Sequence, residues 1–136
     1  MPNPNLKESI LIAERDQTVR ELQKYFLEKA GYSVTFVDDG QSALERALTR
    51  PALIVTEIMI PKLDGLTLCR RLRADPMTRD IPIIVFSILA AGARADEAGA
   101  NAFLRKPIVE SIFVAAIHDL IAARPRAAKE HKWAFQ

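Results

Sequence analysis

Short runs of consecutive apolar residues alternate along the chain with longer stretches in which apolar residues recur every three or four positions. The short runs cover residues 9–13, 33–37, 53–56, 82–86 and 102–104. Continuous apolar runs of this length, rich in β-branched residues, are typical of strands that are buried on both faces of a sheet. The pattern therefore predicts five buried β-strands.

Helical periodicity fills most of the segments between these runs. It is clearest in residues 18–30, 41–49, 66–72 and 108–120. Gly31 and Pro51 follow the first two of these segments and are typical helix stops. Residues 88–101 are rich in alanine and contain two glycines, so they predict at most a short helix.

Five strands that alternate with helices indicate a parallel sheet covered by helices on both faces. With five strands, a flavodoxin-like order of 2-1-3-4-5 is a natural candidate, and its ligand crevice lies at the carboxyl ends of strands 1 and 3. We therefore predict an α/β three-layer sandwich formed by residues 8–122, with flexible ends at 1–7 and 124–136.

Charge and cysteine content narrow the function classes. The chain has 19 Lys and Arg against 17 Asp and Glu, and its excess of basic residues lies after Ala123, so the predicted domain is nearly neutral. A neutral domain argues against nucleic-acid binding. The single cysteine, the lack of a signal peptide and the lack of a long apolar run predict a cytoplasmic protein that makes no membrane contact.

Polar residues directly follow four of the predicted strands. Two carboxylates that converge near a lysine and a serine hydroxyl would form a small site for a cation and an anion together. The same spacing would also arise if these polar residues only ended the strands and had their hydrogen bonds satisfied locally. Spacing alone does not favour the binding site over this structural interpretation. The residues concerned are Glu14, Arg15, Asp16, Glu57, Ser87 and Lys106.

The amino-acid sequences of these segments favour the interpretation as a binding site. Residues 53–73, LIVTEIMIPKLDGLTLCRRLR, closely resemble the response-regulator receiver signature, in which an aspartate ends strand 3 and a methionine, a proline and an Asp-Gly turn follow. Residues 10–16 resemble the acidic-pair segment, residues 82–87 the switch strand, and Lys106-Pro107 the lysine-proline pair. The chain is thus similar to receiver domains over residues 8–122.

This resemblance implies a CheY-like fold and a role in two-component phosphorelay signalling. In the family, an aspartate takes a phosphoryl group from a histidine kinase while acidic residues hold a divalent cation. The resemblance places Glu57 at the phospho-accepting position, Glu14 and Arg15 at the acidic pair, Ser87 and Phe103 at the switch positions, and Lys106 at the conserved lysine.

Two of these positions depart from the family chemistry. Glutamate at position 57 lengthens the carboxylate arm by roughly 1.5 Å, and a displacement of that size costs on the order of a hundredfold in rate. The longer arm also carries its charge towards Ser87 and Lys106, which imitates part of the phosphorylated state.

Arg15 places a fixed positive charge where a cation should bind, and a forked bond to Glu57 or Glu14 would be favourable. We therefore expect no cofactor and no bound Mg²⁺. In the alternative, Arg15 points into solvent, and Glu14, Asp16 and Glu57 hold the metal.

The sequence favours a pseudo-receiver that acts by protein–protein interaction with a sensor histidine kinase or a downstream signalling protein, with a homodimer through the fourth and fifth helices. A working phospho-acceptor, through Glu57, Thr56 or Asp16, is the alternative. A nucleotide- or flavin-binding protein is disfavoured because the segment after the first strand has no glycine. No enzyme is expected, since His118 and His131 lie far from Ser87 in the sequence.

Overall fold

The computed structural model describes residues 6–124, in which strands and helices alternate along the chain. The elements are β1 (Ser9–Ala13), α1 (Gln17–Lys29), β2 (Ser33–Val37), α2 (Gly40–Arg46), the 3₁₀ helix η1 (Ala47–Thr49), β3 (Leu53–Thr56), α3 (Gly65–Ala74), β4 (Ile83–Ser87), α4 (Gly92–Ala98), β5 (Ala102–Arg105) and α5 (Glu110–Ala123). The predicted flexible ends lie mostly outside the described residues.

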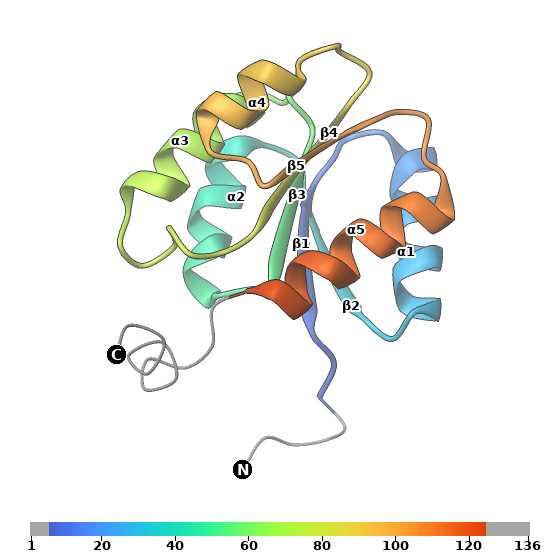
Figure 1. Cartoon of the computed structure of the whole chain (residues 1–136). Helices are drawn as coiled ribbons and strands as arrows, with labels where there is room; N and C mark the ends of the chain where they lie inside the picture. The colour runs from blue at the N-terminus through green and yellow to red at the C-terminus, as the bar shows by residue number, and fades with distance from the viewer. Residues whose placement is uncertain (1–5, 125–136) are drawn as a thin grey trace.

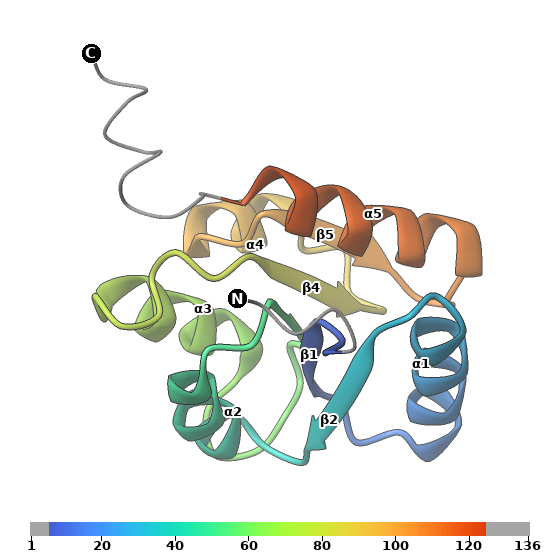
Figure 2. The ribbon, with the colours of Figure 1, turned by 90° about the horizontal axis from the view of Figure 1, so that it is seen from below.

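The five strands form one parallel sheet in the order β2-β1-β3-β4-β5. Helices cover both faces of the sheet, and the layers are visible in Figures 1 and 2. The predicted strand order and three-layer architecture are confirmed. Because all strands run in the same direction, the segments after β1, β3, β4 and β5 meet at one edge of the sheet.

Two apolar cores lie on the two faces of the sheet. On one face, Leu27 of α1 and Phe113 and Ile117 of α5 pack against strand residues. On the other face, side chains of α2, α3 and α4 pack together, with Leu68 and Leu72 of α3 completely buried. Burial on both faces explains why the strands appear in the sequence as continuous apolar runs.

Aspartates fix the starts of three helices that follow strands. The side chains of Asp16, Asp39 and Asp64 cap α1, α2 and α3 by accepting hydrogen bonds from backbone N–H groups in the first turn. Gly65 allows α3 to begin against β3, because a Cβ atom at this position would overlap the backbone carbonyl of Glu57. These contacts hold the loop that carries Glu57 close to the sheet.

The structure refines several predicted boundaries. The helix predicted at 41–49 is α-helical only to Arg46 and ends as a 3₁₀ turn. The strand predicted at 82–86 covers Ile83–Ser87 instead. The short helix predicted within 88–101 is α4. Among residues 6–124, no helix has both the length and the apolar character needed to cross a bilayer.

Candidate functional site

Three charged side chains meet at the carboxyl edge of the sheet. The Nζ atom of Lys106 lies 2.9 Å from Oε1 of Glu14 and 2.9 Å from Oε2 of Glu57. The Lys106, Glu14 and Glu57 side chains are 12%, 4% and 8% exposed, respectively. One ammonium group therefore bridges two buried carboxylates, and we call this arrangement the Glu14–Lys106–Glu57 triad.

Backbone contacts hold both carboxylates in place. The Glu57 backbone N–H donates to the carbonyl of Ala13, which connects the end of β3 to the end of β1. The Glu57 Oε1 atom accepts a hydrogen bond of 2.6 Å from the N–H of Ile58. The Glu14 Oε2 atom accepts from the N–H of Asp16 at 3.1 Å. Each carboxylate thus uses one oxygen for the lysine and the other for the backbone.

Lys106 lies between this acidic pair and an aromatic wall. Its Nζ atom is 5.6 Å from the centre of the Phe86 ring, within the range of a cation–π contact. Burial lowers the pKa of Lys106, but the hydrogen bonds to Glu14 and Glu57 and their charges outweigh that effect and raise it above its ordinary value. The lysine is therefore held as a cation.

The expectation that the Arg15 guanidinium makes a forked ion pair with Glu14 or Glu57 is wrong. Arg15 is exposed, and among residues 6–124 no hydrogen bond or ion pair joins it to either carboxylate. Neighbouring side chains in an extended segment point to opposite sides, so Glu14 faces inward and Arg15 faces solvent. Lys106 supplies the positive charge that the sequence had assigned to the arginine.

Asp16 does not join the triad. Its carboxylate accepts a hydrogen bond of 3.0 Å from the N–H of Val19 and caps α1. Within the part of the chain that the structure describes, no three His, Cys, Asp or Glu side chains are grouped closely enough to hold a metal ion. The proposed ligand set of Glu14, Asp16 and Glu57 is therefore not brought together, because Lys106 bridges Glu14 and Glu57 while Asp16 caps α1.

Of the two predicted switch residues, Ser87 contacts the triad through its backbone, because its carbonyl accepts a hydrogen bond of 2.9 Å from the N–H of Lys106. Ser87 is completely buried at the end of β4, and its hydroxyl accepts a hydrogen bond of 3.2 Å from the N–H of Leu89. No hydrogen bond connects it to Glu57 among the described residues. Phe103 is half-buried in β5, opposite Val85, and packs against the core on the side of α4.

Arg20 is a residue that sequence reasoning missed. Its guanidinium donates to the backbone carbonyls of Glu14 and Val37 and pairs with Asp38 at 2.6 Å. These contacts connect the loop after β1 to the loop after β2. Arg20 lies on α1 among other polar residues, so its spacing in the sequence gives no signal of this role.

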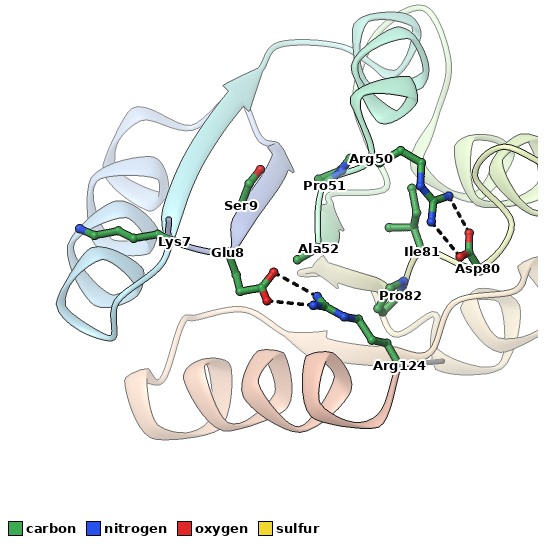
Figure 3. A pocket seen from close by; sticks show the side chains of 10 residues that line it. All are labelled: Lys7, Glu8, Ser9, Arg50, Pro51, Ala52, Asp80, Ile81, Pro82 and Arg124. Carbon is green, nitrogen blue, oxygen red and sulfur yellow. Dashed lines mark hydrogen bonds and ion pairs between the residues drawn. The ribbon is translucent and has the colours of Figure 1, made fainter. Parts of the chain in front are cut away.

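A cavity of about 360 Å³ lies at the opposite, amino-terminal edge of the sheet. Figure 3 shows two ion pairs along it, one between Arg50 and Asp80 and one between Arg124 and Glu8. Both arginine guanidinium groups are paired with carboxylates, so their paired N–H donors are not available to bind an anion. This cavity is far from the triad in the fold.

Comparison with known proteins supports a single family. The model of the response regulator receiver domain matches residues 10–118. The transcriptional regulatory protein CseB of Streptomyces avermitilis is 37% identical over 82% of this chain and 48% of its own length. The chain thus spans about half the length of this curated relative.

Solved structures agree with this match. The signal receiver domain of a signal transduction histidine kinase from Syntrophus aciditrophicus is 34% identical, with a TM-score of 0.79 over 88% of this chain and 96% of that one. The receiver domain of the sensor histidine kinase PA1611 from Pseudomonas aeruginosa, with magnesium coordinated in its active-site cleft, is 27% identical, with a TM-score of 0.80 over 87% of this chain and 100% of that one.

Proposed function

The chain belongs to the family of response regulator receiver domains, and we propose that it is a pseudo-receiver, a signalling module that works without accepting a phosphoryl group. The Glu14–Lys106–Glu57 triad carries this proposal. The lysine already lies 2.9 Å from both carboxylates, so a closed set of ion pairs takes the place of a metal and a phosphoryl group. The module is therefore held near one conformation.

Charge balance supports the loss of metal binding. Mg²⁺ keeps several waters and takes one or two carboxylates in near-octahedral geometry. To bind at this edge, it would have to displace a lysine ammonium from two buried carboxylates and leave that ammonium buried beside a divalent cation. Arg15 would add a further positive charge nearby. We propose that the site takes no divalent cation.

Phosphoryl transfer to Glu57 is disfavoured by its geometry. One oxygen of Glu57 accepts from Lys106 and the other from the N–H of Ile58. Each oxygen therefore already has one partner, and only 8% of the side chain is exposed, so little of the carboxylate is open to a phosphodonor. The other acceptors considered are no better placed, because the Thr56 hydroxyl is buried and donates to the carbonyl of Glu57, while Asp16 caps α1.

The proposed partner is a sensor histidine kinase or a downstream signalling protein in the cytoplasm. We propose that this chain binds its partner through protein–protein contacts and is not itself an enzyme. A homodimer through α4 and α5 remains part of this proposal. The expectation that no nucleic acid is involved is not confirmed, since CseB is named a transcriptional regulatory protein and this chain matches about half of it.

Titration with Mg²⁺ followed by NMR, with and without a small-molecule phosphodonor, tests the proposal. We expect the amide signals of Glu14, Glu57 and Ser87 to stay in place and the intact mass to stay unchanged. Saturable shifts at these three residues, or a mass increase corresponding to one phosphoryl group, would instead identify a working receiver with unusual ligands.

A further inference from the structure

An open apolar groove lies between α1 and α5, on the face of the sheet opposite α2, α3 and α4. Its volume is about 460 Å³, and both helices supply its walls. Figures 1 and 2 show the two helices on the same side of the sheet. The lining residues that matter below are Phe26 and Lys29 from α1, Ala30 directly after it, and Glu110, Val114, Ala115 and Asp119 from α5.

The outward face of α5 carries several apolar side chains beside its polar ones. Of its 14 residues, ESIFVAAIHDLIAA, only Phe113 and Ile117 are buried, whereas Ile112 is 56% exposed and Ala115 is also exposed. Apolar side chains that line an open groove, such as Val114 and Ala115, are typical of a surface to which another segment binds. The groove wall formed by α5 therefore has the character of a surface that another segment covers.

The chain itself continues from the end of α5 with suitable anchors. Residues 125–136 contain Trp133 and Phe135, and aromatic side chains are the usual anchors of apolar pockets. Arg124, where this segment starts, is paired with Glu8 at 2.8 Å. The departure point of the segment is thus fixed at one end of α5.

Distance permits the segment to return to the groove. Residue 114 lies ten helical residues before Arg124, which corresponds to about 15 Å along the helix axis. Trp133 follows Arg124 by nine residues, which can span up to about 30 Å when extended. The chain can therefore reverse direction after α5 and still place Trp133 beside Val114.

The charges are complementary. Residues 125–136 carry three Lys and Arg against one Glu. In the groove wall, Lys29 and Glu110 pair at 2.6 Å and cancel, whereas Asp119 makes no ion pair among the described residues. A net positive segment thus meets a net negative groove, with an apolar floor to receive the aromatic side chains.

We propose that residues 125–136 dock in cis into the α1–α5 groove, with Trp133 as the anchor. Trp133 is the one tryptophan of the chain, so its fluorescence reports on the contact directly. In the full-length protein we expect emission at shorter wavelength and weaker quenching by acrylamide than in a synthetic peptide of residues 125–136.

Paired substitutions locate the contact. Ala115→Lys places a charge in the groove from α5, and Ala30→Lys does so from the residue that follows α1. Each substitution should return the Trp133 emission to that of the peptide. Ile112→Lys, on the same helix but outside the groove, should leave the shift intact. Circular dichroism of all three variants confirms that each is folded.

Three results would overturn the proposal. The first is an emission in the full-length protein equal to that of the peptide. The second is a shift that survives both Ala115→Lys and Ala30→Lys. The third is a shift that disappears on dilution of the protein, because it would assign the groove to the segment of a second copy.

Discussion

The Nζ atom of Lys106 lies 2.9 Å from Oε2 of Glu57, with 12% and 8% of the two side chains exposed. At the other edge of the sheet, Arg124 and Glu8 are 2.8 Å apart with 36% and 47% exposed. The two distances are nearly equal, but the energies differ because exposed ions are largely solvated and buried ions are not.

Lys106→Met should strongly destabilise the protein. It removes the one cation that lies between two buried carboxylates and leaves their repulsion uncompensated, and breaking a buried pair in this way costs about 3–5 kcal/mol. The free energy of unfolding in urea measures the loss. Lys62→Met is the matched control, since Lys62 is 67% exposed and 3.7 Å from Asp39. If Lys62→Met lowered the free energy of unfolding as much as Lys106→Met does, the result would contradict this account.

Arg124→Ala should have a small effect on stability. An exposed ion pair contributes at most about 1 kcal/mol, even with good geometry. The same urea experiment measures it, and the effect should shrink further in high salt because exposed charges are screened. A loss of unfolding free energy comparable to that of Lys106→Met would mean that the ion pair between Arg124 and Glu8 has a larger structural role.

The contribution of Lys106 should depend on pH. The pKa of Lys106 is raised above the ordinary value of 10.5 in the folded protein, so its charge stabilises the fold fully below that value and less as the pH rises through the folded pKa. The stability difference between the wild type and Lys106→Met should therefore be constant at neutral pH and fall in strongly alkaline solution. A difference that grows with pH would show that the lysine is destabilised in the fold.

Glu57→Asp combined with Arg15→Asp should restore metal binding. The shorter carboxylate withdraws from Lys106, and the second change replaces a cation with a further carboxylate at the end of β1. Saturable NMR shifts at Glu14 and Ser87 on addition of Mg²⁺ measure the result, and Glu57→Asp alone is the control that retains Arg15. A double variant that does not respond to Mg²⁺ would refute our explanation of why the site lacks a metal.

Gln23→Leu should stabilise the protein. Gln23 is completely buried in α1, and neither side-chain polar atom has a hydrogen-bond partner among the described residues. An unpaired buried amide costs about 1–3 kcal/mol, which an apolar side chain of similar size recovers. Thermal unfolding measures the gain, and Gln17→Leu at the exposed start of the same helix should change stability little. An unchanged or lower stability would indicate that Gln23 has a polar partner in solution.

The sequence by itself determined the architecture. Continuous apolar runs mark strands that are buried on both faces, and the helices predicted between them indicate a parallel sheet. The strand order was a candidate consistent with this pattern and was implied by the resemblance to receiver domains. The convergence of Glu14, Glu57 and Lys106 also followed, because parallel strands bring their carboxyl ends to one edge.

Only the tertiary structure decided which groups pair at that edge. Glu14 and Arg15 are neighbours in the sequence, but backbone direction turns one inward and the other to solvent, so the arginine that seemed placed to neutralise Glu57 does not reach it. The pairing is settled by side-chain direction and by competition for a few oxygens, and neither is encoded in the spacing of residues. The hydrogen bonds of Arg20 and the unpaired amide of Gln23 could not be predicted from the sequence for the same reason. Both depend on which groups of neighbouring elements lie within reach of the side chain in the folded protein.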